Sequence, residues 1–165
     1  FSYDDEVICG NTRPDVEGVI GSSLNWKGFS VSLNFRYQMG ADVFNEALYS
    51  KVENISRSDL NKNQDKRALY ERWQEEGDIV RFKNIASAET TPMSSRFVQE
   101  ENVLTLESVY LGYEFYDGWI KKLGLSSLKF QVSMRDVFRA STIRSERGIS
   151  YPFARSMEAG LSFNF

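Results

Sequence analysis

The side chains that most often carry out chemistry are scarce in this sequence. Its 165 residues include no histidine and a single cysteine, Cys9, so the commonest general base and the commonest metal ligand are both missing. The acidic pairs Asp4–Asp5 and Glu75–Glu76 have the residue type of acid–base catalysis, but they lie in polar stretches without a pocket-forming context. The acidic run at 4–6 lacks the ligand spacing of a calcium loop. We therefore expect that the protein is not an enzyme and that it has no metal site and no cofactor.

Composition narrows the function classes further. The net charge of −3 disfavours a protein that binds nucleic acid. No stretch approaches the length of about 18 apolar residues that a membrane-spanning helix needs. Aromatic residues make up 14% of the chain, which is high for a water-soluble domain. A membrane β-barrel is compatible with this composition, because its strands alternate apolar and polar residues instead of clustering them.

The clearest structural signal is an unbroken two-residue alternation from Phe29 to Met39. One set of alternate side chains is apolar and the other is polar, so one face of the predicted strand meets an apolar medium and the other a polar one. Half-buried strands of soluble proteins average about five or six residues, whereas a tilted strand needs about 9–11 to cross a bilayer. Its length favours a membrane strand. The apolar set is Phe29, Val31, Leu33, Phe35, Tyr37 and Met39.

Four further segments show the same alternation less regularly. We expect strands at 18–26, 102–116, 127–138 and 157–165. In the second of these, Leu104 and Leu106 fall on the polar face, which indicates a β-bulge or emergence from the bilayer. The last segment has apolar residues at every second position: Met157, Ala159, Leu161, Phe163 and Phe165.

Short and long connections between these segments alternate. The connections at 27–28 and 117–124 are short, and those at 41–101 and 139–152 are long. Up-and-down membrane barrels are built this way, with short periplasmic turns and long extracellular loops. In the longest loop, Asp65 is placed to cap a small helix that has Leu69 and Trp73 one turn apart. The aromatic candidates in this loop are Tyr49, Tyr70 and Trp73, with packing inside the loop favoured for Trp73.

Aromatic residues gather near both ends of the expected strands, as two membrane-interface girdles require. The simpler alternative is that Trp and Phe crowd the strand ends of soluble sheets. Near the short turns lie Trp26, Phe29, Tyr116, Trp119, Phe163 and Phe165. Near the long loops lie Tyr37, Phe44, Phe138, Tyr151 and Phe153. If the apolar faces meet lipid, the lumen-facing candidates are Arg36, Gln38, Lys129, Gln131, Arg135 and Glu158, for which solvation is favoured over specific solute binding.

The C-terminal segment resembles the recognition signal of bacterial outer-membrane barrels, a terminal aromatic residue preceded by alternating apolar positions. Longer stretches resemble the final part of SusC/RagA-type TonB-linked outer-membrane transporters of Bacteroidetes. These are GNTRPDVEGVIGSSLNWKGFSVSLNFRYQMGADVFN at 10–45, RW followed by GD within 72–78, SSRFVQEENVLTLESVYLGYEF at 94–115 and ERGISYPFARSMEAGLSFNF at 146–165. Two departures are Glu76, where the family often has proline, and Arg135–Asp136, where asparagine is more usual.

The resemblance implies an all-β fold, namely the C-terminal segment of about five strands of a transmembrane antiparallel β-barrel with about 22 strands and an internal plug. Residues 1–165 would supply only closing strands, with the loop at 41–101 extracellular. The resemblance also implies that the plug and the N-terminal domains lie upstream of Phe1. Five antiparallel strands would not form a complete barrel, because they leave two unpaired edges that lipid cannot satisfy.

The implied function is TonB-driven import of glycans or peptides across the bacterial outer membrane. With such a function, the loop aromatics Tyr49, Tyr70 and Trp73 would be candidates for stacking on sugar rings or packing on a lipoprotein partner. The expected partners are a SusD-like surface lipoprotein, the rest of the barrel and plug, TonB through the upstream part, the barrel assembly machinery, membrane lipid, and an oligosaccharide or peptide solute, with no nucleic acid. A soluble β-sandwich or jelly-roll binding module with an interaction loop is the alternative. Extraction distinguishes the two, because a sandwich stays in aqueous buffer, whereas a barrel segment needs detergent or its parent barrel.

Overall fold

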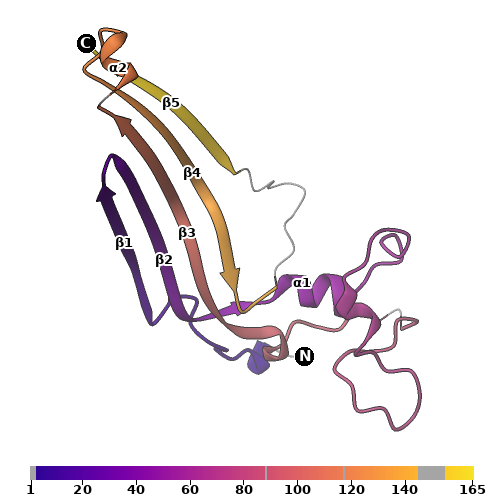
Figure 1. Cartoon of the computed structure of the whole chain (residues 1–165). Helices are drawn as coiled ribbons and strands as arrows, with labels where there is room; N and C mark the ends of the chain where they lie inside the picture. Colours follow the sequence, from indigo (N-terminus) through magenta and orange to yellow (C-terminus); the bar gives the residue numbers. More distant parts are fainter. Residues whose placement is uncertain (1–2, 88, 117, 145–154) are drawn as a thin grey trace. The chain divides into compact units, whose positions relative to one another are not determined.

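The computed structural model describes residues 3–87, 89–116, 118–144 and 155–165. In this part of the chain, five strands form one antiparallel sheet in which neighbours in space are neighbours in sequence (Figure 1). The strands are β1 (Val16–Trp26), β2 (Phe29–Phe44), β3 (Val98–Phe115), β4 (Ser127–Ser141) and β5 (Ser156–Asn164). This order is the up-and-down arrangement that the alternation of short and long connections predicts. All five expected strands are confirmed.

The strands on both sides of the longest loop extend further than the sequence predicts. β2 continues to Phe44 and β3 begins at Val98, so the connection between them spans 45–97 instead of 41–101. The backbone N–H of Asn45 still donates to the carbonyl of Phe97 at 2.8 Å. Side-chain alternation reports only which face is apolar, whereas backbone pairing continues where that alternation has ended.

The described residues form two compact units. The sheet unit comprises 14–41, 101–116, 118–142 and 155–165, and the loop unit comprises 3–13, 42–87, 89–100 and 143–144. The sheet unit contains one short helix, α2 (Trp119–Lys122), within a connection expected to be a plain turn. The loop unit contains η1 (Tyr3–Asp5), α1 (Glu46–Leu48), the π-helix η2 (Tyr49–Glu53), η3 (Lys66–Leu69) and η4 (Ser95–Phe97). None of these helices is long and apolar enough to cross a membrane.

The register confirms that the sheet separates apolar from polar side chains. Leu24 lies opposite Val31, and the rings of Phe29 and Tyr113 are 4.3 Å apart. The apolar face is defined by Leu24, Phe29, Val31, Leu33, Phe35, Val109, Leu111, Tyr113, Leu128, Phe130, Val132, Met134, Met157, Ala159, Leu161 and Phe163. The polar face is defined by Ser30, Ser32, Asn34, Arg36, Ser108, Tyr110, Gly112, Glu114, Lys129, Gln131, Ser133, Arg135, Glu158, Gly160 and Ser162.

A β-bulge lies between β3 and β4, in the region where the sequence indicates one. Leu106 pairs with Phe138 and Ser108 pairs with Arg135, so β4 contributes one more residue than β3 at this point. The backbone of Asp136 has a φ of 51°, a left-handed conformation that aspartate adopts more readily than most residues. A bulge is therefore present beside Leu104 and Leu106, but its extra residue lies in β4, so these two leucines stay on the side of β3 that carries Ser108 and the bulge does not account for their position. The girdle candidates Tyr151 and Phe153 lie outside the described residues.

The helix expected around Leu69 and Trp73 is much shorter than predicted. The cap is correct, since Asp65 accepts a hydrogen bond from the backbone N–H of Arg67 at 2.8 Å, but η3 ends at Leu69. The next residues pair instead with Phe82, whose carbonyl accepts from the N–H of Trp73 at 3.0 Å. This pairing takes the backbone groups that a continuing helix would use. The core of the loop unit is Val52, Ala68 and Phe82, with Leu48 and Ile55 packed against it.

Candidate functional site: the two faces of the sheet

The polar face is cross-linked by side-chain interactions between neighbouring strands. Asn34 Nδ2 donates to Ser108 Oγ at 2.9 Å, and Arg36 forms an ion pair with Glu107. The Tyr110 hydroxyl lies 3.2 Å from Gln131 Oε1. These contacts join β2, β3 and β4 through polar side chains.

The structure brings four of the six lumen-facing candidates together. On β4 and β5, Lys129, Gln131 and Arg135 point to the same face as Glu158, which lies opposite Ser133. The Lys129 ammonium is 5.8 Å from the centre of the Tyr110 ring. The other two candidates lie on β2: Arg36 pairs with Glu107, and Gln38 donates to Glu17 at 3.4 Å.

Glycine makes room for large polar side chains on this face. A Cβ atom at Gly112 would lie 2.9 Å from the Tyr110 hydroxyl, and one at Gly160 would lie 3.2 Å from Gln131 Nε2. The side chain of Tyr110 therefore lies over the backbone of Gly112, and that of Gln131 lies over the backbone of Gly160. The glycines are a packing requirement of the polar face.

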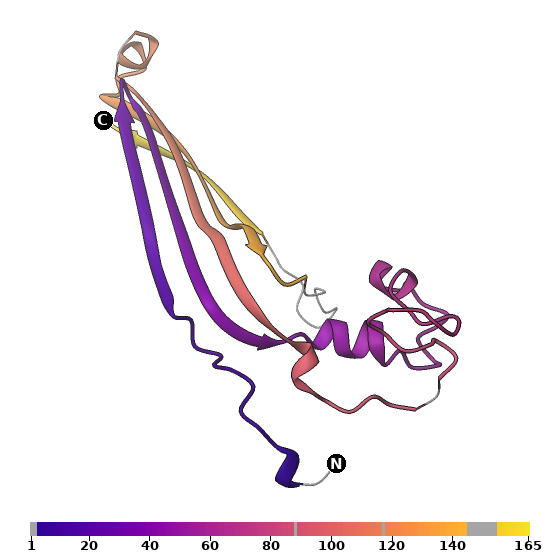
Figure 2. The same ribbon diagram turned by 90° about the horizontal axis from the view of Figure 1, so that it is seen from below.

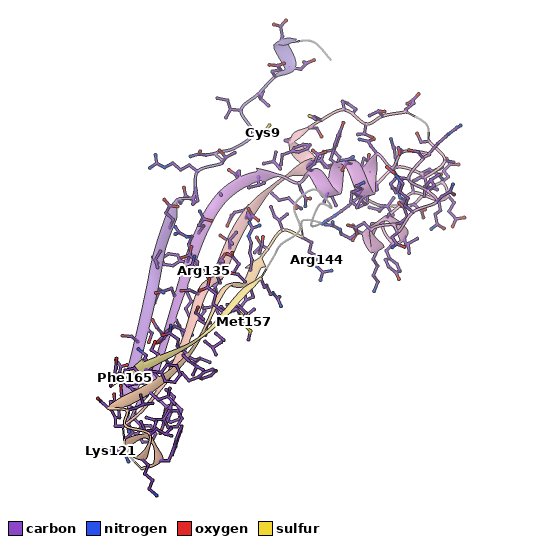
Figure 3. All side chains as sticks on the ribbon, turned by 90° about the horizontal axis from the view of Figure 1, so that it is seen from above. Cys9, Lys121, Arg135, Arg144, Met157 and Phe165 are labelled. Atoms are coloured by element: carbon purple, nitrogen blue, oxygen red, sulfur yellow. The ribbon has the colours of Figure 1, made fainter. Side chains whose placement is uncertain are left out.

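The C-terminal residues that the sequence analysis compared with an assembly signal lie along β5, on the apolar face of the sheet. Met157, Ala159, Leu161 and Phe163 lie opposite Met134, Val132, Phe130 and Leu128 respectively. At the strand end, the Asn164 carbonyl accepts from the N–H of Ser126 at 2.7 Å, and its side chain donates to Ser127 Oγ at 2.8 Å. Phe165 follows directly and is exposed. Figure 3 shows Phe165 at the end of the strands and Met157 further along β5.

Aromatic rings continue from the apolar face to the turn end of the sheet. The ring of Tyr113 contacts Phe115 at 4.5 Å, and Phe115 lies 6.0 Å from Trp119. The turn between β1 and β2, helix α2 and the C-terminus lie at this same end of the sheet (Figure 1, Figure 2). The predicted gathering of aromatic residues at the short-turn end is thus present in the sheet unit.

The three loop aromatics that sequence singles out have different surroundings. Tyr49 packs between Phe44 and Phe97, with ring centres 5.4 and 5.2 Å away. Tyr70 is exposed, with the Lys66 ammonium 5.8 Å from its ring. Trp73 is 41% exposed, so the prediction that it packs inside the loop is wrong. Its segment pairs with Phe82 instead of forming the expected helix.

The RW and GD residues that carry part of the family resemblance stabilise a turn. Arg72 is buried and donates to the carbonyls of Ala68 and Lys83, both at 2.9 Å. The Asp78 carboxylate accepts from the backbone N–H groups of Gln74 and Glu75 at 2.9 and 3.1 Å. These hydrogen bonds hold the pKa of Asp78 below its ordinary value. The motif has a structural role in the loop unit.

A buried carboxylate in the loop unit escaped the sequence analysis. Glu53 is 2% exposed and accepts hydrogen bonds from Arg96 Nη2 at 2.6 Å and from Thr91 Oγ1 at 2.7 Å. Burial opposes its ionised form, but the bonds from Thr91, Arg96 and the N–H of Lys83 outweigh burial, and the pKa of Glu53 lies below its ordinary value. No sequence signal marks it, because its partners are 30 or more residues away.

The described strands form a single meander sheet with one apolar and one polar face, and they are 9 to 18 residues long. These features define a segment of a transmembrane antiparallel β-barrel. Solved structures share this fold. The RagAB peptide importer in its open-open state matches with a TM-score of 0.74 at 18% identity, over 100% of this chain and 19% of that chain. The closed-closed state matches with a TM-score of 0.62 at 19% identity, over 85% of this chain and 15% of that chain.

Sequence comparison points to the same class. A TonB-dependent receptor, P39, of Formosa agariphila is 25% identical over 138 residues, covering 81% of this chain and 13% of the receptor. No family model matches the chain. The resemblance to SusC/RagA-type TonB-linked outer-membrane transporters is therefore confirmed. The proteins it matches are named as a receptor and an importer, not as enzymes.

Proposed function

We propose that this chain forms the C-terminal closing strands of a TonB-dependent transporter in the bacterial outer membrane. The observation that carries the proposal is an apolar face that continues across neighbouring strands while its side chains stay exposed, as Leu24, Leu111 and Phe130 do. An apolar surface of this extent needs another apolar phase to cover it. The acyl chains of a bilayer supply that phase around a barrel.

The remainder of the parent protein would close the barrel. Within the described sheet, β1 and β5 each have a single neighbouring strand, and an unpaired edge in lipid leaves N–H and C=O groups unsatisfied. We assign both edges to strands of the rest of the barrel. The final strand, with its apolar residues ending at Phe165, would be the segment that the barrel assembly machinery recognises.

We assign the polar face to the lumen, where it would contact the plug, water or passing solute. Its side chains mostly pair with one another, as Asn34 does with Ser108 and Tyr110 with Gln131. Such pairing favours a solvated wall over a specific solute site. The solute class that the resemblance supports is glycans or peptides, with transport driven through TonB by the upstream part of the protein.

The loop unit is assigned to the cell surface, where it would contact a SusD-like lipoprotein or cover the barrel mouth. The motivation is the length of the 45–97 connection, since connections this long are usually functional. Exposed aromatic side chains at Tyr70 and Trp73 are available for such contacts.

The test uses the full-length parent in its own cells. We expect it in the outer-membrane fraction and resistant to alkaline carbonate, because paired strands hold it in the bilayer. Solute uptake should stop when the proton-motive force is collapsed. Protease added to intact cells lacking the lipoprotein should cut within 45–97, whereas cleavage only after membrane rupture would put that loop on the wrong side. Recovery of the protein in aqueous buffer without detergent would refute the proposal and favour the β-sandwich alternative.

A further inference from the structure

The turn end of the sheet unit carries side chains to which the proposed transport function assigns no role. Two connections meet there, the turn at 27–28 and the segment 116–126 that contains α2. The carbonyl of Gly28 accepts a hydrogen bond from the N–H of Glu114 at 2.9 Å. The first turn therefore lies directly beside the end of β3, two residues before the second connection begins.

The geometry of α2 presents apolar side chains outward at this end. Ile120 is fully buried and anchors the helix, and its carbonyl accepts from the N–H groups of Leu123 and Leu125 at 3.0 and 3.3 Å. With Ile120 turned inward, Trp119 and Leu123 are 53% and 62% exposed. Trp26, at the end of β1, is exposed as well, so two of the three tryptophans in the chain lie here.

Positive charge collects at the same place. The segments 27–28 and 116–126 contain Lys27, Lys121, Lys122 and one acidic residue, Asp117, which gives 3 − 1 = +2 on a chain whose net charge is −3. The Lys27 ammonium is 5.1 Å from the centre of the Trp26 ring. Figure 3 shows Lys121 at the far end of the unit, pointing away from the strands. The nearby Glu114 belongs to the polar face and accepts from the Tyr116 hydroxyl at 2.9 Å.

We propose that this basic aromatic rim, made of Trp26, Lys27, Trp119, Lys121, Lys122 and Leu123, binds the headgroups of anionic phospholipids. The proposal rests on the membrane function proposed above. Tryptophan rings favour the headgroup level of a bilayer, and lysine stems lie along apolar surface while the ammonium reaches outward to phosphate. A lysine near an anionic bilayer surface contributes about five-fold to association. A zwitterionic headgroup has no net charge and provides no comparable gain.

The test measures lipid selectivity of the full-length protein in phosphatidylcholine vesicles that contain trace spin-labelled phosphatidylglycerol or spin-labelled phosphatidylcholine. The spectral fraction of motionally restricted label reports lipid bound to the protein. We expect selectivity for phosphatidylglycerol that falls by about five-fold or more in the triple variant Lys27→Gln, Lys121→Gln, Lys122→Gln. The matched control is Lys51→Gln, Lys62→Gln, Lys66→Gln in the loop unit, which removes the same charge and should leave selectivity unchanged.

The possible outcomes separate the two proposals. Unchanged selectivity in the rim variant, or an equal loss in the loop control, would overturn the lipid-binding rim. Absence of any motionally restricted label would instead overturn the membrane proposal itself. If the rim triple variant does not fold, the arginine triple Lys27→Arg, Lys121→Arg, Lys122→Arg should keep the selectivity, and the single variant Lys122→Gln should lower it. Failure of both expectations would also refute the rim.

Discussion

Replacing Glu53 by glutamine tests how the loop unit is held together. The carboxylate receives hydrogen bonds from Arg96, from Thr91 and, at 3.3 Å, from the N–H of Lys83, so one side chain joins three segments that are distant in sequence. Glutamine preserves the shape and one acceptor oxygen. It removes the negative charge beside Arg96 and turns an acceptor into a donor.

The expected loss of stability follows from the burial of the Glu53–Arg96 ion pair. Breaking a fully buried ion pair costs about 3–5 kcal/mol, but the Arg96 side chain is 46% exposed, so water screens part of the interaction. We expect Glu53→Gln to lower the free energy of opening of the loop unit by about 1–3 kcal/mol. Native-state proteolysis of the full-length protein, with cleavage sites mapped within 45–97, measures this free energy. The control is Asp59→Asn, which breaks a surface pair with Lys62 and should change opening little.

Because Glu53 is ionised in the folded loop unit, we also expect the opening of this unit to depend on pH. Because the pKa of folded Glu53 lies below its ordinary value near 4.5, its contribution is complete above that value and is lost as the pH falls through the folded pKa. The wild-type loop unit should therefore open more readily in that acidic window, and the Glu53→Gln variant should lack this step. Equal opening free energies for wild type and variant at neutral pH would refute the reasoning.

Three further changes test the sheet unit. Leu33→Arg should cost about 2–4 kcal/mol of unfolding free energy in the reconstituted barrel if Leu33 lies near the bilayer midplane, and Ser32→Arg on the polar face far less; equal costs would show that the faces are misassigned. Gly28→Ala should destabilise by about 1–3 kcal/mol, because φ is +89° and the new Cβ would lie 2.6 Å from the carbonyl oxygen of Glu114; unchanged unfolding in urea would contradict this turn. Deleting Phe165 should lower the amount of heat-modifiable, folded barrel in the outer membrane but leave solute affinity unchanged, whereas normal levels with lost binding would assign Phe165 another role.

The sequence by itself determined the strands and their faces. An apolar residue at every second position is a local property of the chain, so the run from Phe29 to Met39 identifies a two-faced strand without knowledge of its neighbours. The same pattern marked Leu104 and Leu106 as an irregularity, but it did not show that the bulge at this point adds its residue to the partner strand β4, which depends on strand pairing. The resemblance of several stretches to one transporter class then identified the kind of barrel.

Only the tertiary structure decided features that depend on distant partners. The helix expected at Leu69 and Trp73 gave way to pairing with Phe82, and Glu53 became the buried junction of the loop unit through Thr91 and Arg96. Neither result has a local signal, because backbone donors and buried charges are satisfied by whichever groups the fold brings near. The basic aromatic rim is of the same kind, since its residues come from two segments, 26–27 and 119–123, that are more than ninety positions apart and meet only when the sheet forms.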